Sequence, residues 1–167
     1  MIRVGLTLLG LLAAPAGAAG TLILTPAGLG PVRIGMTQKQ VIGALGGTLT
    51  GQAIESDDIC VEKESSVLSG VGFMFEEGKL TRISIGEGSD IATPRGIGVG
   101  TAAIAVRYAY RGKLKAEPNT YLDKPAEYLT YWTVPGKSGV RFEIDEKRKV
   151  YVIHAGTRSI QYVEGCA

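Results

Sequence analysis

Histidine is almost missing from this sequence, since His154 is the only one among 167 residues. A metal site built from several histidines is therefore excluded, and a nucleophilic serine or cysteine would have a single histidine available as its base. The alternation of apolar and polar residues around position 154 predicts that His154 points away from the apolar face of a strand. We interpret it as a surface residue, and we expect neither a metal ion nor another cofactor.

The short motifs of common enzymes are also missing. No G-x-S-x-G occurs, and no pair of carboxylates is spaced convincingly for general acid–base chemistry. Glu55, Asp57 and Asp58 form an acidic cluster, but they match a calcium-binding loop poorly, so we interpret them as a solvated loop. An enzyme is the least favoured class of function for this chain.

An excess of charge of one sign is absent as well. The chain has 18 Lys and Arg residues against 16 Asp and Glu residues, a formal net charge of +2. This balance gives no electrostatic case for binding nucleic acid or an anionic membrane. The short basic run Lys147-Arg148-Lys149 is interpreted as a solvated hairpin tip. We therefore expect no nucleic-acid partner; the expected partner is another protein.

The N-terminus has the pattern of a secretory signal peptide. Arg3 precedes an uncharged apolar run over residues 4–14, and Ala16-Gly17-Ala18 supplies small residues for cleavage, so residues 1–19 are expected to be removed. The alternative, a membrane anchor, would need roughly 20 apolar residues. No cysteine follows the signal directly, so a lipid anchor is not expected. We predict a periplasmic or secreted protein that is not stably inserted in a membrane.

Cysteine occurs only twice, as Cys60 and Cys166. In an oxidising compartment these two can form one intramolecular disulfide, which we predict. In the chain-entropy model, a closed loop on the order of 100 residues stabilises the fold by up to ~4.7 kcal/mol. The alternative is a pair of free redox thiols. That chemistry is typical of a C-x-x-C pair or an activating base nearby, and neither occurs.

What the chain does contain is a repeated pattern. Residues 33–47, RIGMTQKQVIGALGG, align with residues 98–112, GVGTAAIAVRYAYRG, and each segment predicts a short helix after a glycine-led turn. Each is followed by a predicted hairpin, with strands at 71–77 and 80–86 in the first copy and at 140–146 and 150–156 in the second. Residues 20–90 and 91–167 are thus predicted to be two tandem repeats.

Local signals support these elements. Thr37 and Gln40 form a capping box at the start of the first helix. Strand alternation places Val71, Phe73 and Phe75 on one side of the sheet. Further strands are expected at 59–64 and 128–134, with others at 22–24, where the mature chain opens, and at 159–163, where the sheet closes. The predicted fold class is α+β: two copies of a short helix plus a hairpin, sharing one antiparallel sheet with both helices packed on one face.

The Gly35-Met36-Thr37 helix entry, the short helix and the hairpin, repeated in tandem over about residues 30–156, resemble the β-lactamase-inhibitory-protein-like (BLIP-like) fold. A related single unit occurs in envelope lipoproteins of the SmpA/BamE type. This chain has no inhibitory loop that can be matched. It also lacks the anchoring cysteine of the lipoproteins and has two units where they have one. The resemblance implies a binding protein or an envelope component.

Aromatic residues suggest where binding could occur. All seven tyrosines and the single tryptophan lie at position 108 or beyond, and one of Tyr131 and Trp132 should be near solvent. Tyrosine and tryptophan are enriched at protein interfaces. The candidate partner-binding face, opposite the helices, consists of Arg82, Ser84, Tyr131, Trp132, Arg141, Glu143, Val152 and His154. We expect a binding or inhibitor-like module; the alternatives are a structural envelope component and a plain solvated sheet face.

Overall fold

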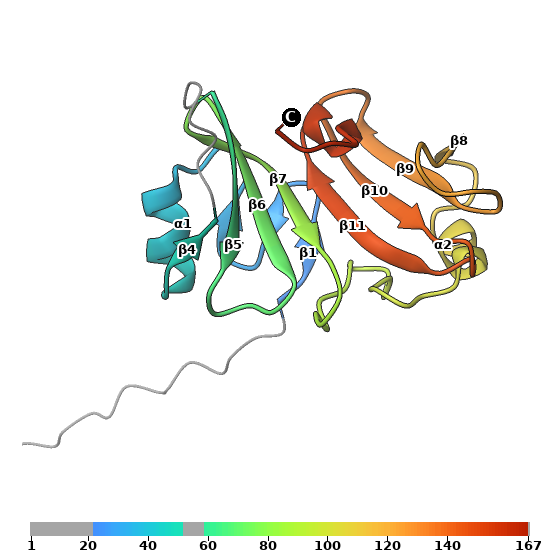
Figure 1. Cartoon of the computed structure of the whole chain (residues 1–167), viewed down its shortest axis with the longest axis horizontal. Coiled ribbons are helices and arrows are strands. Elements are labelled where there is room, and N and C mark those ends of the chain that lie inside the picture. The colour runs from blue at the N-terminus through green and yellow to red at the C-terminus, as the bar shows by residue number, and fades with distance from the viewer. Residues whose placement is uncertain (1–21, 52–58, 167) are drawn as a thin grey trace, which may run out of the picture.

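Residues 22–51 and 59–166 fold as an α+β protein with two antiparallel sheets and two short α-helices (Figure 1). The computed structural model describes residues 22–51 and 59–166. The expected signal peptide and the acidic cluster of Glu55, Asp57 and Asp58 lie outside these residues. None of the helices in the described ranges is long and apolar enough to cross a membrane.

The larger sheet has eight strands. Its strands, in spatial order, are β4 Leu49–Thr50, β5 Cys60–Ser65, β6 Val71–Glu76, β7 Lys79–Ile85, β11 Val150–Gly156, β10 Ser138–Ile144, β9 Glu127–Val134 and β8 Leu114–Pro118. The halves meet where β7 pairs with β11, with Ser84 opposite His154. The expected strands at 59–64 and 128–134 are confirmed as β5 and β9, whereas β4 and β8 were not predicted.

The two helices lie at opposite ends of the molecule in Figure 1. Helix α1, Gln38–Leu45, begins with the predicted capping box, in which the Thr37 hydroxyl and the Gln40 side chain each bind the other residue's backbone amide. Helix α2, Ala103–Ala109, has Ala102 at its N-cap, whose side chain cannot accept a capping hydrogen bond. The loop at 147–149 caps the helix start instead, because the Arg148 carbonyl accepts a hydrogen bond from the Ala103 amide.

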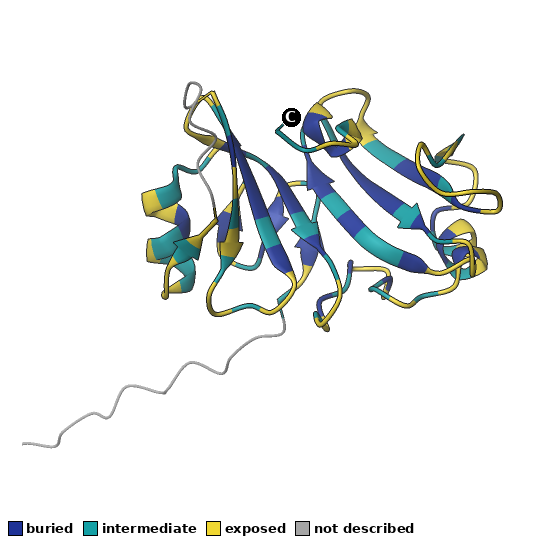
Figure 2. Ribbon diagram, viewed as in Figure 1, coloured by how far each residue is buried: buried dark blue, intermediate teal, exposed yellow. Residues whose placement is uncertain are grey.

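The hydrophobic core lies on one face of the large sheet. The expected alternation of faces is confirmed, since Val71, Phe73 and Phe75 of β6 belong to the core cluster and the intervening Met74 does not. Residues on both faces of β6 and β10 are buried (Figure 2). Val41 of α1 and Val106 of α2 belong to the same cluster. Burying this much apolar surface is the main favourable term in folding.

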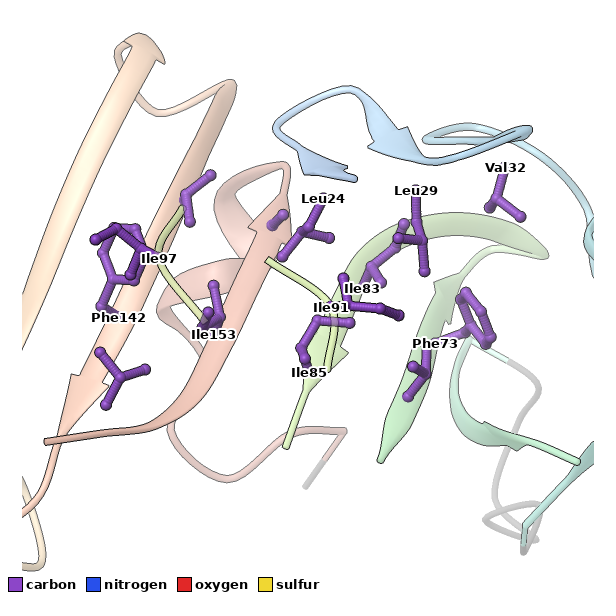
Figure 3. Close-up of a cluster of buried hydrophobic side chains, with 14 of the residues drawn as sticks. Leu24, Leu29, Val32, Phe73, Ile83, Ile85, Ile91, Ile97, Phe142 and Ile153 are labelled. Atoms are coloured by element: carbon purple, nitrogen blue, oxygen red, sulfur yellow. The ribbon is translucent and has the colours of Figure 1, made fainter. Parts of the chain in front are cut away.

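The strand expected at 22–24 is present at Leu24–Thr25, but it belongs to a small separate sheet that the sequence did not predict and that covers the middle of this core. It consists of β1 Leu24–Thr25, β2 Gly28–Leu29 and β3 Val32–Arg33. Figure 3 shows its Leu24, Leu29 and Val32 pointing at the side chains of the large sheet, beside Ile91 and Ile97. The strands are only two residues long, so apolar periodicity over longer windows could not reveal them.

The segment after β11 does not form a strand, so the expectation for residues 159–163 was wrong. Residues Arg158–Gln161 form a 3-10 helix, η1, which begins where the Thr157 hydroxyl accepts a hydrogen bond from the Ser159 amide. We call residues 157–166 the C-terminal segment. Helix η1 packs against β7, β10 and β11, so this segment crosses the junction between the two halves (Figure 1).

Candidate functional site

The face of the large sheet opposite the core carries a continuous row of polar and small residues. In an antiparallel sheet, directly paired residues share a face. Following the pairs from β5 to β8 gives Glu64, Gly72, Ser84, His154, Arg141, Thr130 and Lys115. We call this set the polar row. It runs across both halves of the molecule.

Seven of the eight residues proposed for the candidate face lie on this side of the sheet. Ser84, Arg141 and His154 belong to the polar row, and the neighbouring rows add Arg82, Glu143, Val152 and Trp132. The eighth residue, Tyr131, lies on the core side: its ring centroid is 5.0 Å from that of Tyr110, which in turn packs on Phe142.

The face is not an open surface, because Arg82 and Arg141 are each only 4% exposed. The cover over Arg82 is the C-terminal segment. Arg82 Nη1 donates hydrogen bonds to the carbonyl oxygens of Ser159, at 3.1 Å, and Tyr162, at 3.0 Å. Arg82 Nη2 pairs with the Glu62 carboxylate. Arg82 therefore does not face solvent, as a residue on an open sheet face would. Strand periodicity predicts on which side of the sheet a side chain lies, but it does not predict whether another segment covers that side.

The predicted disulfide is confirmed and holds this segment in place. Cys60 at the start of β5 is bonded to Cys166, 106 residues later in the chain. The bond joins the first half of the large sheet to the end of the C-terminal segment. Strand β5 thus holds the segment directly, through Cys60, while its Glu62 pairs with the Arg82 that binds the segment's carbonyl oxygens.

Arg141 occupies the centre of the face in the second half. Its guanidinium carbon lies 3.6 Å from the centre of the Tyr128 ring, a cation–π contact. Burial lowers the pKa of Arg141, an effect that the nearby Glu143 carboxylate partly offsets. The neighbouring Thr130 is completely buried, and neither its hydroxyl nor the Arg141 Nε has a hydrogen-bond partner among the described residues.

His154 is largely buried, which corrects its interpretation as a surface residue. Its side chain is 12% exposed, its Nδ1 lies 2.8 Å from the Ser84 hydroxyl, and its Nε2 lies 3.4 Å from a Glu143 carboxylate oxygen. Burial lowers the pKa of His154 below 6.5, although Glu143 acts in the opposite sense. A neutral imidazole with its proton on Nε2 can donate toward Glu143 and accept from Ser84.

Glu143 remains ionised in this environment. Burial alone would raise the pKa of Glu143, but hydrogen bonds from His154 and Tyr151 and the charge of Arg141 outweigh it, and the pKa is lowered from 4.5. Strict alternation along β11 would place Tyr151 on the apolar face, opposite Val152. A register shift between Glu143 and Ile144 breaks the alternation there, and the Tyr151 hydroxyl donates to Glu143 at 2.7 Å.

A groove opens on the same face in the first half of the sheet. It has a volume of about 440 Å³, and its lining includes Glu64, Gly72, Ser84, Gly86 and Val152. The glycines and the serine leave the sheet surface low at this point, because their side chains are absent or small. The polar row thus contains a recess at its β5–β7 end and buried charges at its β9–β11 end.

The polar face offers hydrogen-bond donors and acceptors to a partner. It also contains a serine–histidine–carboxylate series, Ser84, His154 and Glu143, of the kind that acyl-transfer enzymes use. Among residues 22–51 and 59–166, no three His, Cys, Asp or Glu side chains converge to hold a metal ion. The fold and this face define an α+β protein with an eight-stranded antiparallel sheet, one face apolar and the other polar with a groove. Comparison with family models, curated proteins and solved structures found no match to this chain.

Proposed function

We propose that this chain is an exported binding module that holds a protein partner on its polar sheet face, in the groove beside Ser84. The supporting observation is the groove itself, about 440 Å³ of recess floored by Gly72 and Ser84. A floor without large side chains can receive a side chain or loop of a partner. The Glu64 and Val152 walls offer one charged and one apolar contact.

The proposal includes a tandem duplication of the BLIP-like kind. Each half of the molecule has a helix followed in sequence by four antiparallel strands, α1 with β4 to β7 and α2 with β8 to β11. The spatial order 4-5-6-7-11-10-9-8 reads the same from either edge when the halves are exchanged. A duplicated unit that pairs its two last strands produces this order.

Export is a further part of the proposal. The disulfide between Cys60 and Cys166 is of the kind that forms and persists in oxidising compartments. Together with the signal-like pattern of residues 1–19, it favours the periplasm or the outside of the cell.

Affinity capture with matched glycine variants tests the binding function. Immobilised oxidised protein is exposed to envelope and periplasmic fractions, alongside Gly72→Gln, which fills the groove, and Gly43→Gln, which adds the same side chain to open space on α1. The expected result is one stoichiometric protein held by wild type and by Gly43→Gln and lost with Gly72→Gln. Many envelope proteins held equally by all three forms would favour the alternative, a structural envelope component.

A hydrolase is the second candidate, favoured by the line from Ser84 through His154 to Glu143. A neutral histidine bonded to a serine hydroxyl is the arrangement that activates a nucleophile. However, β7 lies between β6 and β11, so its backbone amides serve the sheet and are not free to stabilise an oxyanion. Labelling by a fluorophosphonate in wild type, and none in Ser84→Ala, would replace the binding function with this one.

A further inference from the structure

The two most exposed large apolar residues of the described chain lie one helical turn apart on α2. Ile104 is 74% exposed and Tyr108 is 72% exposed. Residues four apart lie on the same side of a helix, so these side chains form one apolar patch. The opposite side of α2, with Ala103 and Val106, is buried in the core. Nothing in the hydrophobic core requires Ile104 and Tyr108 to be apolar.

Basic residues surround this patch from two distant parts of the sequence. On α2 and just beyond it, Arg107 is exposed and the Arg111 guanidinium lies 3.9 Å from the centre of the Tyr108 ring. The tip of the β10–β11 hairpin contributes the exposed run Lys147-Arg148-Lys149. The tip is fixed against the helix start, because the Ala103 amide donates to the Arg148 carbonyl at 2.8 Å.

A groove of about 460 Å³ lies between the helix and the hairpin tip. Its lining combines apolar groups with a basic rim, and consists of Ala102, Ala103, Ile104, Arg107, Pro125, Glu127, Lys147, Arg148 and Lys149. Aliphatic stems of lysine and arginine can lie along apolar surface while their charges point outward. The patch and the groove therefore form one surface with an apolar centre and a cationic rim.

The carboxylates nearby do not cancel this charge. Glu127 pairs with Arg107, and the Asp145 carboxylate accepts a hydrogen bond from the Lys149 amide at 2.7 Å. Glu146 is the third carboxylate, against five cations. The whole chain has a net charge of only +2, but a surface responds to charges within about a Debye length, ~8–10 Å. A charged partner at this surface would therefore meet an excess of positive charge, five cations against three carboxylates.

We propose that this surface docks the protein on an anionic phospholipid bilayer, with Ile104 and Tyr108 in the headgroup region and the basic residues against lipid phosphates. An aliphatic and an aromatic side chain ringed by lysine and arginine is the composition of peripheral membrane contacts. The site is separate from the polar face, because α2 packs through Tyr110 on Phe142, on the core side of the sheet. The docking is therefore independent of the proposed binding function.

Vesicle co-sedimentation tests this inference with the oxidised protein from residue 20 to the C-terminus. Vesicles of phosphatidylethanolamine and phosphatidylglycerol at 3:1 are compared with pure phosphatidylcholine, from 20 to 500 mM salt. We expect binding to the anionic vesicles that weakens as salt rises, and none to phosphatidylcholine. Each basic residue near an anionic surface strengthens binding about fivefold.

Two variants and their controls separate the apolar and electrostatic parts. Lys147→Gln with Lys149→Gln should weaken vesicle binding by more than about tenfold, and Ile104→Gln by about tenfold. Lys79→Gln and Val134→Gln, at exposed positions elsewhere, should leave it unchanged. Melting temperatures close to that of wild type would show that all the variants are folded.

Four outcomes would overturn the inference. Equal binding to both kinds of vesicle, or to neither, removes the anionic bilayer as the partner. Anionic binding that Ile104→Gln does not weaken indicates general electrostatic attraction without docking of the patch. NMR shifts at Arg107 and Lys147 with inorganic phosphate alone, without vesicle binding, would indicate a free-anion site. Binding of a poly-glutamate peptide in preference to vesicles would indicate an acidic protein partner.

Discussion

At the scale of single residues, Arg82 has the largest structural role on the polar face. It joins β7 to the C-terminal segment and to β5 through three contacts, while being 4% exposed. Arg82→Met keeps a long unbranched side chain, but it removes the hydrogen-bond donor to the Ser159 and Tyr162 carbonyl oxygens and to Glu62. We expect a loss of about 3 kcal/mol in the free energy of unfolding, measured with urea.

Arg158→Met is the matched control for this substitution. Arg158 is exposed on the same segment, so its replacement should change stability by less than ~0.5 kcal/mol. If the Arg82 and Arg158 variants were equally stable, water would be replacing the guanidinium, and the anchoring role of Arg82 would be refuted.

His154 makes stability depend on pH in a way that can be assigned to one residue. Its pKa is lowered in the folded protein, so below about pH 6.5 the unfolded chain takes up a proton that the folded protein does not. Stability is fully present above pH 6.5 and falls as the pH decreases toward the folded pKa. Urea unfolding at pH 7.5 and 5.5 should show this loss.

His154→Gln should remove that pH dependence, because the chain has no other histidine. In the wild type a further loss should begin below about pH 4.5, where the lowered pKa of Glu143 has the same sign: stability is present above 4.5 and lost on further acidification. An unchanged slope between pH 7.5 and 5.5 in the variant would mean that His154 titrates alike in both states.

At the scale of elements, the junction of β7 and β11 depends on Gly156. Its φ is +145°, and a Cβ there would lie 2.1 Å from the Thr81 carbonyl oxygen. Gly156→Ala should therefore cost about 2 kcal/mol or more, measured as a fall in melting temperature. Gly43→Ala in α1 meets no atom within 4 Å and should stabilise by up to ~1 kcal/mol. A neutral Gly156→Ala would mean that the two strands can separate without cost.

Elements with local signals were predictable from the sequence. Thr37 and Gln40 specify the start of α1, and the alternation of Val71, Phe73 and Phe75 specifies β6 and the face it buries. Helix α2 lacks such a cap at Ala102, and only its alignment with α1 revealed it. The two-residue strands of the small sheet and the side chain of Tyr151, displaced by a register shift, carry no periodic signal.

The candidate site was predictable in its membership and not in its exposure. Pairing rules placed Ser84, Arg141 and His154 on one face, as the structure has them. Burial of Arg82 depends on residues 77 and 80 positions later in the chain, which no local pattern indicates. The contact between α2 and the hairpin tip at 147–149 also joins residues far apart in the chain, so no local pattern predicts it.

At the scale of the whole molecule, the disulfide should account for a large part of the stability. Replacing Cys60 and Cys166 together with serine opens a loop of 106 residues and should cost up to ~4.7 kcal/mol in the chain-entropy model. Denaturant unfolding with and without a dithiol reductant measures this cost. The reduced wild type should match the variant, and wild-type stability indifferent to reductant would refute the prediction.

The same bond determines how the protein responds to mechanical tension. Residues 60–166 form a covalent ring that contains β5 to β11. A force applied at the two ends of the chain passes from Cys60 directly to Cys166, so only residues before the ring, including β1 to β4 and α1, can be extended. Reduction should add about 350 Å of extensible chain in a single-molecule pulling experiment. In its oxidised form, strands β5 to β11, which carry the polar face, cannot be extended by such a force.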